Sequence, residues 1–180
     1  MTQSLPIAQL GNSILRQQAQ AVDNLDDQRL QQLIDDLIAT VVESNGVGIA
    51  APQVSQSDRL FIVASRPNLR YPHAPTMAPT AMINPRIIAH SPETIKDWEG
   101  CLCVPGIRGL VPRYQAIEVE YTDRDGQRHQ QQLTDFIARI FQHEYDHLDG
   151  LIFLDRLETT RDIITEQEYL QRVLPKTSVG

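Results

Sequence analysis

The chain has 180 residues and a mass of 20.4 kDa, which is enough for one compact core and too short for two ordinary enzyme domains. Its 41% hydrophobic and 22% charged residues are typical of a folded globular protein and exclude a disordered or fibrous chain. A formal net charge of -7 argues against direct nucleic-acid binding and against attachment to an acidic membrane. We therefore expect a single domain over residues 1–180.

The only two cysteines, Cys101 and Cys103, are separated by one residue. That spacing suits a disulfide poorly, and reduced thiols are typical of cytosolic proteins. The N-terminus has no cationic segment followed by an apolar run, and no stretch of sequence approaches the ~20 apolar residues of a membrane span. We expect a cytoplasmic protein that makes no membrane contact.

The first predicted helix lies near the N-terminus. Apolar residues recur there at helical spacing, at positions 30, 33, 34, 37, 38, 41 and 42. Asn45 and Gly46 follow, and both residue types accept the left-handed backbone found at helix ends. Residues 46–53 are small and mostly apolar, and we predict a loop held close to another part of the chain.

Short strands are expected in the middle of the chain. Apolar runs or alternating patterns predict them at residues 60–64, 82–89, 116–122 and 127–133. Between the first two, residues 65–79 contain four prolines, which indicates a long surface loop. Asp125 and Gly126 form a hairpin turn signal between the last two. Such short, turn-linked strands favour antiparallel pairing.

A second helix is predicted from Thr134 or Asp135 to the Asp149-Gly150 pair, and a third helical stretch over residues 160–173. One stripe of the second helix carries Phe136, Ile140, His143 and His147. The predicted fold is therefore α+β: short antiparallel strands packed around a central helix, with an amphipathic N-terminal helix and a C-terminal helix.

His143, Glu144 and His147 form an HExxH pattern on this central helix. Histidines four residues apart lie one turn above each other, so both imidazoles can bind one metal ion. Glu144 lies about 100° around the helix from His143 and can reach a water on that ion. The pattern predicts a metal site with Glu144 as the general base; the alternative is a pair of core histidines.

Two histidines leave a catalytic metal one short of the usual three protein ligands. A zincin peptidase would take a downstream carboxylate, and Glu158, Glu166 and Glu168 are available. The other candidate is Cys101, whose thiol a bound metal would deprotonate. The residues alone leave both alternatives open.

Three sequence blocks resemble those of the peptide deformylase family. They read GVGIAAPQ at 46–53, EGCL at 99–102 and QHEYDH at 142–147, and LPI at 5–7, LR at 15–16 and VPR at 111–113 also match. The resemblance covers about residues 5–157. It implies an enzyme that hydrolyses the N-formyl group from the initiator methionine of newly synthesised polypeptides and releases formate.

The resemblance also implies the composition of the metal site. Cys101, His143 and His147 would hold one divalent ion, Fe(II) in the native enzyme, with Zn or Ni as substitutes. The side-chain amide of Gln53 and the backbone N–H of Leu102 would stabilise the oxyanion of the reaction. At position 103 this chain has cysteine where most members of the family carry serine, and we expect it to be a tolerated small residue.

Substrate binding is assigned partly from the residues and partly from the resemblance. Val47, Phe136 and Ile140 adjoin the ligands in sequence or share their helical stripe, so they are candidates to line a methionine pocket. By the resemblance, Gly48 lets an extended peptide approach the backbone, and Arg108 lies near the peptide chain. Glu99 and Arg113 resemble a family ion pair that braces the second block.

Two alternatives stand beside this interpretation: a zincin-type metallopeptidase and a non-catalytic binder of formyl-methionine peptide ends. A binder has no need of the general base Glu144. The expected partner is an N-formyl-methionyl nascent peptide, with a transient ribosome contact. Residues 158–180 carry three basic against four acidic residues, so tight electrostatic docking is not supported. We expect a monomer that binds no nucleic acid sequence-specifically.

Overall fold

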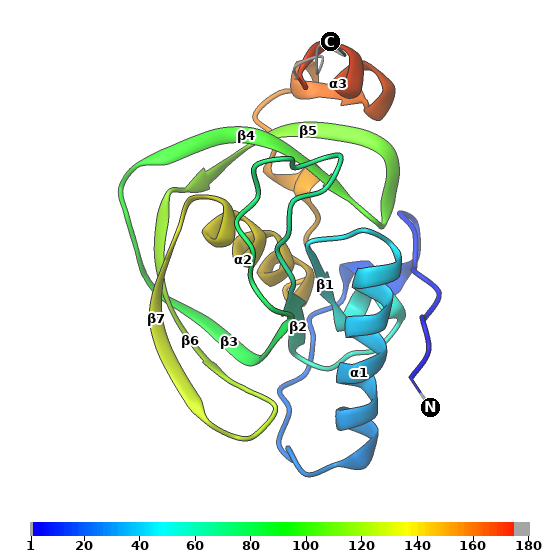
Figure 1. The fold of residues 1–180 in the computed structure, drawn as a ribbon, viewed down its shortest axis with the longest axis vertical. Coiled ribbons are helices and arrows are strands. Elements are labelled where there is room, and N and C mark those ends of the chain that lie inside the picture. Colours follow the sequence, from blue (N-terminus) through cyan, green and yellow to red (C-terminus); the bar gives the residue numbers. More distant parts are fainter. Residues whose placement is uncertain (1, 175–180) are drawn as a thin grey trace.

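The computed structural model describes residues 2–174, in which two antiparallel sheets surround helix α2 (Figure 1). The first sheet has the order β1-β2-β3-β6-β7 and the second the order β4-β5-β8. The helices are α1 (Gln28–Glu43), α2 (Asp135–Leu148) and α3 (Glu166–Arg172). The strands are β1 (Gly48–Ala50), β2 (Leu60–Val63), β3 (Thr80–His90), β4 (Thr94–Cys101), β5 (Val104–Tyr114), β6 (Ala116–Thr122), β7 (Arg128–Thr134) and β8 (Ile163–Thr165). The prediction of a mixed fold with antiparallel strands is confirmed.

Local sequence signals explain the ends of the two long helices. Asp27 caps α1 by accepting a hydrogen bond from the backbone N–H of Arg29, and Asn45 beyond its C-terminus has φ +52°. Helix α2 begins directly after the extended Thr134, and Gly150 follows it with φ +73°. Both predicted helices are confirmed, and α2 carries both histidines of the HExxH pattern.

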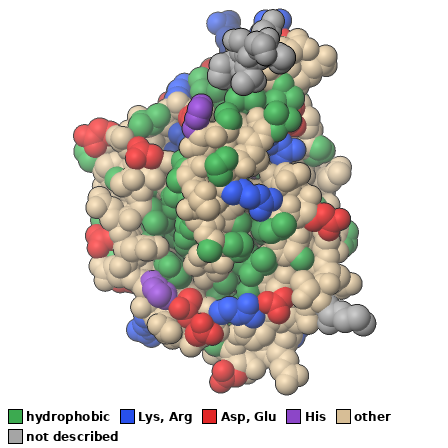
Figure 2. Space-filling view, viewed as in Figure 1, with side chains coloured by type: hydrophobic (Ala, Val, Ile, Leu, Met, Phe, Trp, Pro, Cys, Tyr) green, Lys and Arg blue, Asp and Glu red, His purple; other side chains and the backbone are tan. Residues whose placement is uncertain are grey.

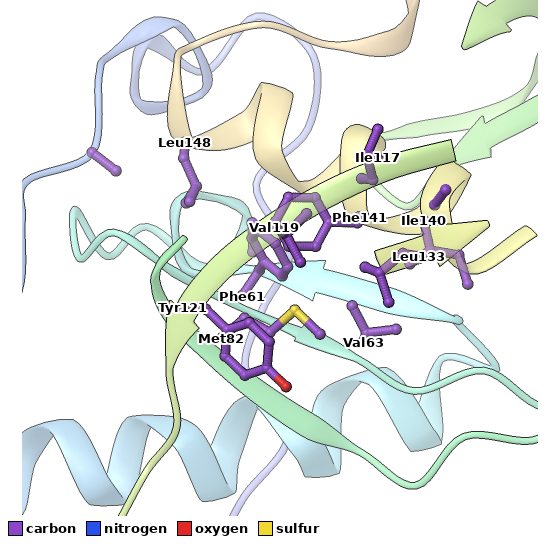
Figure 3. Packing of buried hydrophobic residues seen from close by; sticks show 13 residues of the cluster. Phe61, Val63, Met82, Ile117, Val119, Tyr121, Leu133, Ile140, Phe141 and Leu148 are labelled. Carbon is purple, nitrogen blue, oxygen red and sulfur yellow. The ribbon is translucent and has the colours of Figure 1, made fainter. Parts of the chain in front are cut away.

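Strand β2 lies between two hydrophobic clusters because helices cover both faces of its sheet. Its side chains alternate: Phe61 and Val63 pack toward α2, whereas Leu60 and Ile62 join the cluster that α1 completes. On the α2 side, Phe61 meets Phe141 edge-to-face with ring centroids 5.0 Å apart (Figure 3). Burial of α2 in this cluster fixes which of its faces points away, toward β4 and β5.

The predicted helix over residues 160–173 is wrong in its first half. Residues Thr160–Asp162 form a 3-10 turn, and Ile163–Thr165 form strand β8, which pairs with residues 107–109 of β5. These β-branched residues favour a strand once a partner edge is available. Thr165 then caps α3, since its side chain accepts a hydrogen bond from Glu168 N.

Strands β4 and β5 were not predicted, and neither was β1, which lies within the expected loop at 46–53. Strand β5 has eleven residues and pairs with β4 along most of its length, but Pro105 and Pro112 argued against a strand at the level of sequence. The β4–β5 register shifts between Gly100 and Cys101, so the cysteine segment is bent and not a regular strand. Both cysteines are free, as predicted, and Cys103 is buried in a hydrophobic cluster.

The described surface carries mixed charge. On the face in Figure 2, acidic and basic side chains are interspersed, and no broad basic patch is visible among the described residues. Within residues 2–174, no helix combines the length and the apolar character needed to cross a bilayer.

Candidate active site

Three potential metal ligands meet where the end of β4 faces helix α2. Cys101 comes from β4, and His143 and His147 come from adjacent turns of α2. One ligand atom from each lies within 4.8 Å of the other two, and Cys101 Sγ is 3.3 Å from His147 Nε2. One thiolate and two imidazoles suit a divalent transition-metal ion, and a single ion fits this spacing.

The tautomer of His143 is set by Glu99. Nδ1 of His143 donates a hydrogen bond to Glu99 Oε2 at 2.9 Å. Because the carboxylate can only accept, the proton of the neutral imidazole lies on Nδ1, and Nε2 keeps its lone pair for a metal. Among the described residues, Nδ1 of His147 has no such partner, and burial holds the pKa of His147 well below the usual range. Burial opposes the charged form of His143 as well, but the hydrogen bond and charge of Glu99 raise its pKa, so a metal ion at Nε2 would have to displace a proton there.

Glu99 is ionised although it is buried. Burial opposes the charged form, but the charge and hydrogen bonds of Arg113, together with the hydrogen bond from His143, hold the pKa of Glu99 well below its usual range. Arg113 binds both carboxylate oxygens at 2.9 Å and also donates to Asp146 at 2.6 Å. The predicted Glu99–Arg113 pair is thus present, and it joins β4, β5 and α2.

Cys101 lies beside Gln53, the last residue of the first sequence block. The Gln53 side-chain oxygen accepts a hydrogen bond from Ala50 N at 2.7 Å, which directs its amide nitrogen toward Cys101 Sγ, 3.5 Å away. The neighbouring Cys103 thiol and burial both raise the pKa of Cys101. A cation bound at this site would offset that cost and favour the thiolate.

Glu144 is the carboxylate of the site that lacks a cationic partner. Its side chain is buried, and Oε2 has no hydrogen-bond partner within the described part of the chain. Burial raises the pKa of Glu144 to about 7, although the charge of His143 opposes the shift. A base whose pKa lies near the working pH can both accept and return a proton, which fits the predicted role.

Gly48 is required by the position of Glu144. A Cβ atom at residue 48 would lie 2.5 Å from Glu144 Oε1 and 2.9 Å from its Cδ. We predicted this glycine from the approach of a peptide, and the structure adds that it leaves room for the buried carboxylate.

We expect Gly48→Ala to displace the Glu144 carboxylate and lower kcat by at least about tenfold, because proton transfer depends on its position. Metal content should stay at the parent level, since the new methyl group touches no ligand. Steady-state kinetics with a formylated peptide, alongside elemental analysis, measures both. Alanine at Gly106 is the control for a glycine substitution at the pocket wall: a Cβ there would meet no atom within 4 Å, and the only cost is backbone strain at φ +75°. An unchanged kcat in Gly48→Ala would contradict this account.

A cavity of about 160 Å³ opens onto these residues. Its lining includes Val47, Gly48, Phe136, Ile140 and Arg108, the five predicted substrate-binding residues, together with Gln53, Cys101, Leu102, His143 and Glu144. The fold thus brings the predicted residues to one place; His147 is not part of the lining, but its ligand atom lies within 4.8 Å of those of Cys101 and His143. Ile140 serves in the hydrophobic cluster under α2 as well.

Arg108 is already engaged by protein groups. Its guanidinium donates to Tyr71 Oη at 2.9 Å and to Glu166 at 3.2 Å, and it lies over the rings of Tyr71 and Tyr169. Tyr71 in turn packs against Phe136, with ring centroids 4.9 Å apart. A substrate near Arg108 would therefore meet a residue held in place from several sides.

Sequence reasoning missed Arg70 and Tyr71, which also line the cavity. Both lie in the segment over residues 65–79, which we predicted to be a plain surface loop. Nothing local marks them, because their role arises from a loop that returns over the pocket. The aromatic ring of Tyr71, with Pro72 beside it, was the only available signal.

The three carboxylates considered for a zincin ligand are paired with basic side chains and lie outside the group of potential ligands, although Glu166 also lines the cavity. Glu158 pairs with Lys96, Glu166 with Arg70 and Arg108, and Glu168 with Arg172. Within residues 2–174, the only group of potential metal ligands is Cys101, His143 and His147. The structure therefore favours Cys101 over a downstream carboxylate as the third ligand.

A Cys-His-His ligand set beside a buried carboxylate defines a metal-dependent hydrolase. The sequence model of the polypeptide deformylase family matches residues 4–162. The chain belongs to this family and is an enzyme that removes the N-formyl group from polypeptides.

Individual relatives extend the match over nearly the whole chain. Peptide deformylase 2 of Nostoc sp. is 68% identical over 173 residues, 96% of this chain and 97% of the relative. Peptide deformylase 2 of Shewanella oneidensis is 50% identical over 164 residues, 91% of this chain and 90% of the relative. A Met-Ala-Ser-bound crystal structure of a class I type b peptide deformylase from Acinetobacter baumannii superposes with a TM-score of 0.85 at 46% identity, covering 87% of this chain and all of that one.

Proposed function

We propose that this chain, as one metallohydrolase domain over residues 1–180, removes the formyl group from the initiator methionine of nascent polypeptides at one divalent ion held by Cys101, His143 and His147. The observation that carries the proposal is the convergence of these three ligands, two of which line the cavity together with the buried Glu144. Helix α2 is the central element of the arrangement, because it supplies two ligands and the general base.

The chain's own residues account for the proton and charge movements. A bound divalent ion supplies a Lewis acid that makes a coordinated water more acidic. Glu144 accepts the proton of the water that attacks the formyl carbon and passes it to the leaving amine. The Gln53 amide, directed toward Cys101, and the Leu102 N–H donate to the oxyanion that develops on the formyl oxygen.

The peptide is proposed to lie along β1. This strand is at the edge of the five-stranded sheet, so its outer side can accept an added extended segment. Gly48 lies on this edge, and Val47, Phe136 and Ile140 offer apolar surface to a methionine side chain. The Acinetobacter baumannii relative was crystallised with Met-Ala-Ser bound, which supports a methionine-led peptide as the ligand.

The remaining assignments follow from the family and from the donor set. We propose Fe(II) as the native ion, with Zn or Ni as substitutes, in a cytoplasmic monomer. A ribosome contact would be transient, since α3 pairs Arg172 with its own Glu168 and so offers little free positive charge. Of the other two basic residues in this segment, Arg161 lies before α3 and Lys176 lies outside the described residues.

The decisive test is the product formed. The purified protein, loaded with nickel, is expected to release formate from formyl-Met-Ala-Ser and to leave internal peptide bonds of an unformylated peptide uncut. A formate assay and mass spectrometry of the peptide distinguish the two reactions. Saturable binding without formate would instead indicate a binder, and internal cleavage a peptidase.

Cys101→Ala is expected to lower bound metal to background, because two imidazoles alone hold a divalent ion far more weakly than three ligands. Elemental analysis of protein purified under anaerobic conditions measures this. Cys103→Ser should keep the metal, since Cys103 is not part of the ligand group. Parent-level metal in Cys101→Ala would remove the proposed ligand set.

A further inference from the structure

We propose that Arg139 is a positioning residue for the metal site. It lies one turn before His143 on α2, and its guanidinium joins this helix to the Glu99 carboxylate and to two strands. The inference rests on the ligand set proposed above. It concerns how the ligands supplied by α2 are kept in register with Cys101, which comes from the end of β4.

Arg139 completes the hydrogen bonding of Glu99. The carboxylate receives four bonds: two from Arg113, one from His143 and one from Arg139, whose Nη1 donates to Oε1 at 2.8 Å. A carboxylate has about four acceptor positions, so all of them are occupied. A fully bonded Glu99 has little freedom to rotate, and its orientation determines that of the His143 imidazole.

The same guanidinium also links helix to sheet. Nη1 donates to the carbonyl oxygen of Val111 on β5 at 2.9 Å, and Nη2 donates to that of Ile95 on β4 at 2.6 Å. Strand β4 continues from Ile95 through Glu99 to Cys101. Arg139 thereby fixes the strand that carries the thiol against the helix that carries both imidazoles.

The stem and the head of Arg139 have separate surroundings. The residue is 7% exposed and is among the residues that line the cavity, and its guanidinium bonds to Glu99 and to two strand carbonyls. Methionine at position 139 would keep an unbranched apolar side chain and remove all three hydrogen bonds. This separation allows ligand positioning to be tested apart from pocket shape.

A purely structural role would give a different result. Arg59 provides the matched comparison, because it binds α2 at its other end: its Nη1 donates to Leu148 O at 3.3 Å and to Asp149 at 2.8 Å. Arg59→Met removes a carboxylate contact and a carbonyl contact from the same helix. It leaves Glu99 and the ligands untouched.

The experiment loads full-length parent, Arg139→Met, Arg139→Lys and Arg59→Met with nickel(II) and follows transfer of the ion to an excess of a coloured chelator. Arg139→Met is expected to release nickel about tenfold faster or more, because it frees Glu99, the hydrogen-bond partner of the ligand His143, and loss of such support weakens metal binding. Arg139→Lys keeps the charge but cannot make three forked bonds, so an intermediate rate is expected. Arg59→Met should stay within about twofold of the parent.

A second readout follows ligand geometry directly. In cobalt(II)-loaded protein, the thiolate-to-cobalt absorption band reports on the Cys101 bond, and Arg139→Met should shift or weaken it while Arg59→Met does not. KM for formyl-Met-Ala-Ser should change little in Arg139→Met, because the apolar stem remains, whereas kcat should fall.

Nickel release and a cobalt band equal to those of the parent, or equal to those of Arg59→Met, would overturn the inference. If Arg139→Met does not fold, Arg139→Lys decides: release at least about threefold faster supports the role, and parent-like release overturns it. Cys101→Ala separates the two levels of argument. If Cys101→Ala loses nickel while the Arg139 variants retain it like the parent, only the inference on Arg139 is wrong. If Cys101→Ala retains nickel, the proposed ligand set itself is wrong.

Discussion

Glu144→Gln is expected to abolish formate release while the protein keeps its metal. Glutamine has the same shape as glutamate but cannot accept a proton, so the loss should amount to ~10²–10⁴-fold in kcat. Glu144 donates no ligand atom to the group formed by Cys101, His143 and His147, and metal content should therefore equal that of the parent. Formate release and elemental analysis on the same preparation measure the two quantities.

Glu118→Gln is a suitable control, since this carboxylate lies on β6 and binds Gln130 at the surface. Its activity should equal that of the parent. Retention of more than about a tenth of the parental rate in Glu144→Gln would mean that another group accepts the proton.

The same substitution should change how stability depends on pH in protein freed of metal by a chelator. An unfolded glutamate titrates near ~4.3, whereas the pKa of the buried Glu144 is about 7. Because the native-state pKa is the higher, the unfolded state loses its proton first, and the free energy of unfolding falls as pH rises through this window. Glutamine does not titrate. In urea unfolding, Glu144→Gln should therefore be more stable than the parent at pH values above the native-state pKa of Glu144, and similar to the parent at pH values below the unfolded-state pKa.

Glu99→Gln should cause the largest loss of stability. It removes the only anion that contacts Arg113, Arg139 and His143 together, and it leaves buried positive charge without a full partner. Breaking a buried pair in this way costs ~3–5 kcal/mol. Glu99→Gln should also weaken metal binding. Urea unfolding in the presence of a chelator measures the loss in free energy of unfolding without that contribution.

The pH dependence of the parent gives an independent check on Glu99. Its pKa is depressed in the native state, so its contribution is fully present above the unfolded-state pKa of ~4.3 and is lost as pH falls further. In Glu99→Gln, the free energy of unfolding should therefore depend less on pH in this acid range. Asp149→Asn, which removes the partly exposed partner of Arg59, should cost less than ~1 kcal/mol. Equal losses in the two variants would show that Glu99 is not a central support.

Two ligands and the general base could be predicted from local spacing, because the HExxH pattern places two imidazoles on one helix face. The third ligand could not: the residues left Cys101 and downstream carboxylates open, and the family resemblance pointed to Cys101. Arg139 could not be found this way. An arginine on a helix normally reaches solvent, and only the packing of β4 and β5 against α2 shows that this one is buried.

The fold was predicted correctly where apolar residues recur at helical spacing, and incorrectly where a segment becomes a strand only by pairing with a neighbouring strand. Both long helices follow from their apolar stripes, whereas β5 contains two prolines and two glycines and becomes a strand only because β4 and β8 lie beside it. Residues Ile163–Thr165 show the same effect: their sequence suits a helix or a strand, and pairing with the edge of β5 selects the strand. Tyr71 belongs to this group too, because its place over the pocket depends on the path of a long loop.

The three proposed ligands are unevenly spaced along the chain, and this spacing affects the order in which they can bind a metal ion during folding. The two histidines are separated by a single helical turn, so α2 alone can present them, but Cys101 and His147 are 46 residues apart and meet only when β4 has docked. A folding chain could thus hold an ion loosely on two imidazoles before the thiol arrives. With the proposed ligand set, capture by all three residues would mark completion of the tertiary structure, and the ion would stabilise that final state by ~2.7 kcal/mol when its free concentration is a hundred times the dissociation constant.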